Sequence, residues 1–77
     1  MNMSGPVVSR FADIIWQNEP ISRSEIAALA EKELGWKRTT SYTVLTRLIE
    51  RGFFQISGKT VTSRISREEF YAQKSFF

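Results

Sequence analysis

Apolar side chains recur every three to four residues in three segments of the chain, which is the spacing of one face of an α-helix. The first segment runs from about Pro6 to Gln17, and its apolar stripe consists of Val7, Val8, Phe11, Ile14 and Ile15. Pro20 follows closely and disfavours helical backbone in the residue before it. We therefore predict a first helix over about 6–17 that packs its stripe into the core.

The second segment opens on the spacing of a capping box. Ser22 can accept a hydrogen bond from the amide of Glu25, and the Glu25 carboxylate can accept one from the amide of Ser22. Ile26, Leu29, Ala30 and Leu34 follow at helical spacing, and Gly35 marks the end. The sequence predicts a second helix here, with Ile21 in a short extended link before it.

The third segment combines an apolar stripe with an unusual outer face. Ser41, Val44, Leu45, Leu48 and Ile49 fall on one side of a helix over about 39–51, which Gly52 ends. The opposite side carries Thr39, Thr40, Thr43, Thr46, Arg47 and Glu50, with Tyr42 on the flank. Threonine is a mediocre helix former, and solvated faces usually carry Glu, Lys, Gln and Ala. Hydroxyl and guanidinium groups together suit a surface that presses against a polar, anionic partner.

The second and third helices are separated only by residues 35–38, which favours a helix-turn-helix with Trp36 anchoring the corner in the core. The β-branched and aromatic residues at 53–57 and 60–65 then predict two strands, with Gly58-Lys59 as the turn between them. A hairpin placed directly after such a helix is a wing. The predicted fold class is mainly α with a small β-hairpin: a winged helix-turn-helix of three helices, a two-stranded wing over about 53–65 and a C-terminal helix.

A second capping box, formed by Ser66 and Glu69, opens the predicted C-terminal helix. That segment carries four aromatic residues, Phe70, Tyr71, Phe76 and Phe77. They either fold back onto the first helix or lead into a partner surface. We expect one domain over 1–77, with about 1–5 flexible and 66–77 the start of a linker or association helix.

Composition narrows the classes of function. The 77 residues contain no cysteine and no histidine, which removes thiolate metal sites and the commonest metal ligand and general base. The acidic residues are scattered over predicted helix surfaces, so we predict no enzyme, no metal and no cofactor. No apolar run approaches a membrane span, and no signal peptide opens the chain, so we expect a cytoplasmic protein without membrane contact.

Positive charge is concentrated in one half of the chain. The net charge is +3, but residues 37–64 contain six basic residues and one acid, so this segment carries +5 and the remainder −2. Such a distribution is typical of a polyanion-binding face. With the polar outer face of the third helix, it predicts a DNA-binding helix.

The third helix and its surroundings resemble a known family. Trp36, Thr40, Tyr42, Thr43, Leu45, Arg47, Leu48 and Gly52 stand at the spacing of the recognition-helix motif of the penicillinase-repressor family of bacterial winged-helix regulators. Residues 19–26 are similar to that family's entry into its second helix, and 65–70 to its exit from the wing. The first helix and the short wing depart from the family pattern, and the cysteines of its copper-responsive members are absent.

The resemblance implies a transcriptional repressor that binds double-stranded DNA. It implies that helix 39–51 enters the major groove, with Thr40, Tyr42 and Thr43 facing DNA and the wing on the backbone. The residues themselves make Arg38 and Arg47 the best candidates for bidentate or phosphate contacts, with Thr39 and Thr46 beside them. Arg47 could instead pair with Glu50 or brace the wing. Lys37, Lys59 and Arg64 are assigned to backbone neutralisation.

One domain of this size offers few base contacts, so we expect these 77 residues to be largely monomeric and to bind weakly. Because one copy should bind weakly, we expect a homodimer on a palindromic operator in the functional protein. The alternative function is a winged-helix protein-interaction module that uses the C-terminal aromatics. Apolar anchors on the outer face of the third helix would favour that alternative, and Thr and Arg occupy those positions instead. RNA binding would call for stacking aromatics on a broader sheet.

Overall fold

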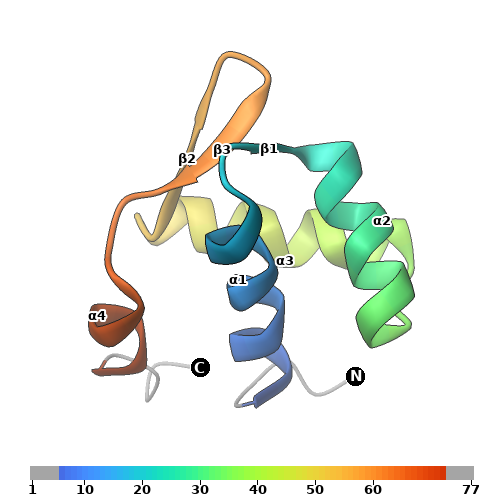
Figure 1. The fold of residues 1–77 in the computed structure, drawn as a ribbon, viewed down its shortest axis with the longest axis horizontal. Coiled ribbons are helices and arrows are strands. Elements are labelled where there is room, and N and C mark those ends of the chain that lie inside the picture. The colour runs from blue at the N-terminus through green and yellow to red at the C-terminus, as the bar shows by residue number, and fades with distance from the viewer. Residues whose placement is uncertain (1–5, 73–77) are drawn as a thin grey trace.

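The helices and the hairpin follow one another in the order that the apolar pattern predicts, in a computed structural model that describes residues 6–72 (Figure 1). The elements are α1 (Pro6–Asn18), β1 (Ile21–Ser22), α2 (Arg23–Leu34), α3 (Arg38–Glu50), β2 (Phe54–Ser57), β3 (Thr60–Ser63) and α4 (Arg67–Ala72). The predicted winged helix-turn-helix is confirmed, and each of the first three helices begins and ends within a residue or two of its predicted bounds. Residues 1–5, predicted to be flexible, lie outside the described part.

The sheet has three strands, not the two that the sequence predicts. Its order is β1-β3-β2, and both pairings are antiparallel. Ile21, predicted to lie in an extended link, pairs with Val61 and is buried. The prediction missed β1 because a two-residue strand has no periodicity of its own and exists only through its distant partner. This pairing ties the start of α2 to the wing formed by β2 and β3.

Local capping sets the ends of α2. The amide of Glu25 donates to Ser22 Oγ at 3.2 Å, and the amide of Ser22 donates to Glu25 Oε1 at 3.3 Å, which confirms the capping box. At the other end Gly35 adopts a left-handed conformation with φ 71°. The chain then turns into Trp36, which is 4% exposed and stacks on Phe11 with ring centroids 5.0 Å apart. Trp36 therefore anchors the corner between α2 and α3, as predicted.

The core lies between α1, α2, the inner face of α3 and the sheet. Val8, Phe11, Ala12 and Ile15 of α1 are fully buried. Val44, Leu45 and Leu48 of α3 are each 2% exposed or less, so the predicted stripe is confirmed. Ser41 shares that face at 1% exposure, and its hydroxyl has no hydrogen-bond partner among the described residues. Burial of this stripe turns the opposite face of α3 outwards.

The C-terminal helix α4 packs back against α1 (Figure 1). Phe70 is fully buried, and its ring meets Trp16 and Phe53 edge-on at centroid distances of 5.2 and 5.4 Å. Arg67 Nε lies 3.0 Å from Asp13 Oδ1, and its guanidinium lies 5.4 Å from the centre of the Trp16 ring. Of the two possibilities left open for the aromatics, Phe70 takes the first. Tyr71 is 37% exposed, and Phe76 and Phe77 lie outside the described residues.

Candidate nucleic-acid interface

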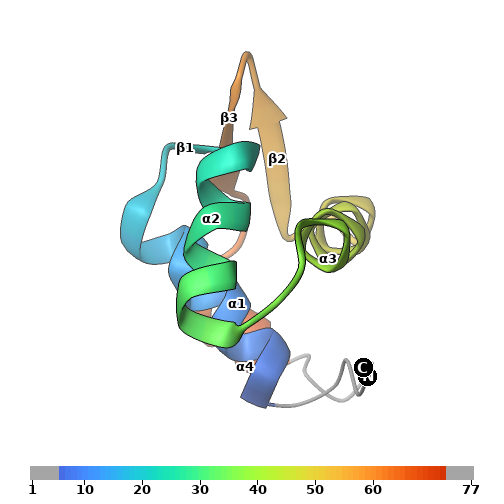
Figure 2. The ribbon, with the colours of Figure 1, turned by 90° about the vertical axis from the view of Figure 1, so that its right-hand side faces the viewer.

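Helix α3 occupies one side of the molecule and is seen nearly end-on in Figure 2, next to the wing. It ends in a Schellman motif, in which the amide of Gly52 donates to Ile49 O at 2.9 Å and the amide of Phe53 to Leu48 O at 3.0 Å. Gly52 has φ 84°, a left-handed conformation that favours glycine. The motif turns the chain directly from α3 into β2, so the helix and the wing are held close together.

The structure brings most of the predicted site residues to the outer surface of α3 and the wing. Nine are exposed, namely Lys37, Arg38, Thr39, Tyr42, Thr43, Thr46, Arg47, Lys59 and Arg64. Thr40 is only half-buried, which makes it the least accessible of the ten. The surface that the sequence predicts is therefore available to a partner.

Helical geometry orders these side chains into a strip and two flanks. At about 100° per residue, Thr39, Thr43 and Thr46 follow the middle of the exposed face. Arg38 and Tyr42 lie on the flank towards α2 and the wing, where Tyr42 lines a groove with residues of both. Arg47 lies on the opposite flank. The face therefore places hydroxyl and methyl groups in the centre and a guanidinium group on each side.

Two contacts within α3 fix the chemistry of this face. Thr43 Oγ1 donates to the carbonyl oxygen of Thr39 at 2.9 Å, so its proton is engaged within the helix. What Thr43 presents outwards is a methyl group and an acceptor oxygen. Arg38 Nη1 donates to Tyr42 Oη at 3.4 Å, a long bond that leaves the tyrosine proton available to an outside acceptor.

Arg47 lies in the last turn of α3, where a cation also interacts favourably with the helix dipole. The pairing with Glu50 considered from the sequence is not among the contacts within residues 6–72. The exposed guanidinium group of Arg47 thus remains accessible to a ligand.

The wing carries its two cations at opposite ends. Gly58 begins the turn with φ 63° and Lys59 follows it, the arrangement of a type II′ hairpin. Lys59 therefore lies at the tip. Arg64 lies beyond the base, where its amide donates to Phe53 O at 2.8 Å. At roughly 3.3 Å per residue the two lie about 16 Å apart along the strand, so they contact separate parts of any long ligand.

The base of the wing is tied to the link between α1 and β1. Glu19 Oε1 accepts hydrogen bonds from the amide of Ser63 at 2.8 Å and from its hydroxyl at 3.0 Å. Both residues are half-buried. This connection holds β3 against the helical body and so fixes the direction in which the wing projects.

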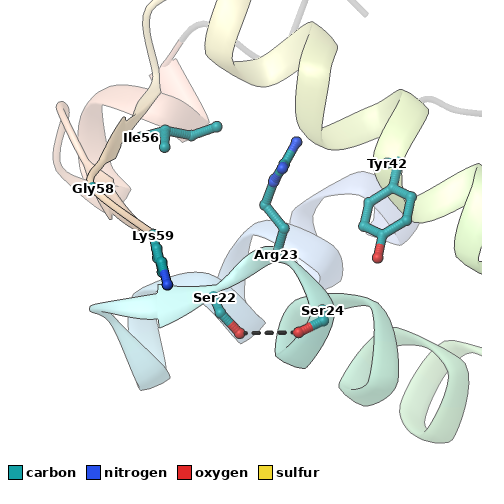
Figure 3. Close-up of a pocket in the computed structure, with 7 residues that line it drawn as sticks. All are labelled: Ser22, Arg23, Ser24, Tyr42, Ile56, Gly58 and Lys59. Carbon is teal, nitrogen blue, oxygen red and sulfur yellow. Dashed lines mark hydrogen bonds between the residues drawn. The ribbon is translucent and has the colours of Figure 1, made fainter.

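Sequence reasoning missed a groove that adjoins the predicted face. It is lined by the first turn of α2, the flank of α3 and the wing, and has a volume of about 590 Å³ (Figure 3). Its lining residues are Ser22, Arg23, Ser24, Tyr42, Ile56, Gly58 and Lys59. Arg23 lies within the capping box of Ser22 and Glu25, and no local pattern could have placed it beside Tyr42 and Lys59. The groove arises from tertiary packing.

Neither a metal centre nor a membrane segment is found in the part of the chain that the structure describes. No three or more His, Cys, Asp or Glu residues lie together there in a way that could hold a metal ion. No helix there has the length and hydropathy that crossing a membrane requires.

The fold and this surface define a class. A helix-turn-helix whose outer third helix is polar and basic, followed by an antiparallel wing, is a winged helix-turn-helix domain. The sequence matches the model of the penicillinase repressor family over residues 5–75, and the chain belongs to that family. Comparison with curated proteins and with solved structures gave no significant match. Members of the family are DNA-binding transcriptional repressors, which are not a class of enzyme.

Proposed function

We propose that this chain binds double-stranded DNA in a sequence-specific way as part of a bacterial transcriptional repressor acting in the cytoplasm, with α3 in the major groove and the wing on the backbone. The observation that carries the proposal is the outer face of α3. From Arg38 to Arg47 its exposed side chains offer hydroxyl and guanidinium groups, and no carboxylate or aliphatic anchor is among them. A protein-binding face would instead present apolar anchors.

The strip and its flanks match the cross-section of a major groove. Side chains in the middle of an inserted helix meet base edges, whereas side chains on its flanks meet the two phosphate backbones. The threonines of the strip are therefore assigned to the bases. Arg38 and Arg47 are assigned to phosphates on opposite sides, and the interface ends before Glu50, whose carboxylate would be repelled by the backbone.

The internal bond of Thr43 gives it a preference among bases. Because its proton is directed to Thr39 O, the side chain can accept a hydrogen bond and offer a methyl contact. Amino groups of adenine or cytosine and the methyl group of thymine suit these two features. Guanine presents two acceptors in the major groove, so it offers neither a donor nor a methyl group to Thr43. We therefore expect Thr43 to favour an A·T pair in which both features are satisfied.

A single domain is a weak binder on this view. A bidentate base contact gives roughly 1–3 kcal/mol of discrimination, and the two exposed side chains of this face that could make one, Arg38 and Arg47, are assigned to phosphates. Affinity for one copy should lie near the non-specific range of roughly 10⁻⁴ to 10⁻⁶ M. We propose that the functional protein is a homodimer on a palindromic operator, which adds a second copy of the same contacts. The 77-residue chain alone is expected to sediment largely as a monomer.

The proposal is tested by titrating labelled duplex DNA with the protein from about 50 to 200 mM salt. We expect Arg47→Ala to reduce the slope of log K against log salt by about 0.9, the change for one lost phosphate contact. Arg10→Ala, which removes an exposed arginine of α1, is the matched control and should leave the slope unchanged. Absence of binding to any duplex at the lowest salt would refute the proposed function. An unchanged slope for Arg47→Ala would remove only that residue from the interface.

A further inference from the structure

Positive charge is concentrated in the groove between α2, α3 and the wing, and no carboxylate is among the residues that line it. Two of its seven lining residues are cationic, three carry hydroxyl groups, and none is a carboxylate. In Figure 3 the side chain of Arg23 extends into the space between Ile56 of the wing and Tyr42 of α3. Lys59 contributes the second cation from the wing tip. Side chains from α2, α3 and the wing thus line one groove whose charged residues are all basic.

Both cations are available to a ligand. Within residues 6–72 neither Arg23 nor Lys59 has an ion-pair or hydrogen-bond partner for its side chain, whereas Arg67 is paired with Asp13. The nearest acid in sequence, Glu25, is hydrogen-bonded to Ser22 in the capping box and is not one of the residues that line the groove. The capping box also satisfies amide groups at the N-terminus of α2. The positive charge of the groove therefore comes from the side chains of Arg23 and Lys59 and not from the helix end.

The hydroxyl group of Tyr42, which lines the groove opposite Arg23, can donate a hydrogen bond. Because Tyr42 Oη accepts from Arg38, its own proton can be given to an anion. Figure 3 shows this hydroxyl directed to the side of the groove that Ser24 lines. Ile56, 46% exposed, adds an apolar wall. Cations, a hydroxyl donor and an apolar wall together suit a phosphate joined to a sugar.

The position of the groove identifies the source of that phosphate. It lies on the Arg38–Tyr42 flank of α3 and between α3 and the wing, the two elements assigned to one DNA duplex. A backbone that runs beside α3 towards the wing tip therefore passes over it. We propose that the groove holds a backbone phosphate of the bound duplex, with Arg23 and Lys59 as charged contacts and Tyr42 as an O–H donor. This inference rests on the proposed function, and Arg23 becomes an additional positioning residue of the interface.

The test is the salt dependence of duplex binding for the full 77-residue chain carrying Arg23→Gln or Lys59→Gln. Each variant should lower the slope of log K against log salt by about 0.9 and weaken binding about five- to tenfold at 0.1 M salt. The loss should be equal on unrelated duplex sequences, because a phosphate contact carries no sequence information. Tyr42→Phe should weaken binding without changing the slope, since it removes a neutral donor.

Two controls separate charge from structure. Lys32→Gln removes an exposed cation from the far end of the same helix and should leave the slope at its wild-type value. Arg23→Lys keeps the charge and should restore the slope that Arg23→Gln loses. If wild type binds in an Arg47-dependent way but the slope is unchanged in Arg23→Gln and Lys59→Gln, the groove inference is overturned and the proposed function stands. If wild type binds no duplex, both are overturned.

Discussion

The contact between Glu19 and Ser63, two residues 44 positions apart, offers a direct test of how the wing is held. The amide and the hydroxyl of Ser63 both donate to the charged Glu19 carboxylate, and hydrogen bonds to a charged group contribute roughly 1.5–3 kcal/mol each. Both residues are half-buried, so water replaces part of what is lost. We therefore expect Glu19→Ala to lower the free energy of unfolding by about 2 kcal/mol. For a domain of this size that is a fall of roughly 8–16 °C in Tm.

The partner substitution separates the two bonds. Ser63→Ala removes the hydroxyl donor but keeps the amide donor, so about 1 kcal/mol should be lost. In the Glu19→Ala background the same change should cost little, giving a coupling free energy of about 1 kcal/mol in a double-mutant cycle. The assay is urea unfolding followed by the fluorescence of Trp16 and Trp36.

Glu31→Ala removes an exposed acid from α2 and serves as the control, with an expected effect within about 0.5 kcal/mol. A coupling of zero between Glu19→Ala and Ser63→Ala would refute the reasoning. It would mean that the hydrogen bond from the Ser63 hydroxyl contributes nothing in solution. An unchanged stability of Glu19→Ala would show the same for the bond from the Ser63 amide, and would leave packing at β3 to set the direction of the wing.

Two further predictions concern α3. Ser41→Ala should raise the free energy of unfolding by about 1 kcal/mol, because it removes a buried hydroxyl without a partner and improves helix propensity; a lower Tm on calorimetry would show that the hydroxyl is hydrogen-bonded after all. Gly52→Ala should lower the free energy of unfolding by about 1–2 kcal/mol, since φ 84° is strained for any residue with a Cβ although no atom blocks that Cβ; urea unfolding at an unchanged midpoint would contradict this.

The features that were predictable from the sequence are those whose causes are local. The capping box of Ser22 and Glu25, and the Schellman end at Gly52, depend on residues within one or two turns of each other. The inner stripe of α3 was predictable because its period reports burial directly. The corner role of Trp36 followed from an aromatic residue in a tight turn between two amphipathic helices.

The features that the sequence could not supply arise from pairing across long separations. Ile21 becomes a strand only because Val61 lies beside it. The same pairing carries the first turn of α2 to the wing, and this proximity creates the groove that contains Arg23. Lys59 and Arg64 could be recognised as exposed cations, but the hairpin geometry was needed to place them at opposite ends of the wing. The list of candidate residues therefore came from the sequence, and their grouping came from the fold.

The two faces of α3 differ in composition because they have different roles: the inner face stabilises the helix, and the outer face is exposed. Val44, Leu45 and Leu48 are essentially buried, and each contributes roughly 1.5–3 kcal/mol through burial. Each outward threonine costs at most about 0.7 kcal/mol of helix propensity relative to alanine. Because the inner face stabilises the helix by more than the outer face weakens it, the outer face is free to carry hydroxyl and methyl groups that helix formation alone would not select. The strip of threonines lies between two arginines on a surface without carboxylates up to Arg47. This is the strongest physical support for the proposal that α3 lies against DNA.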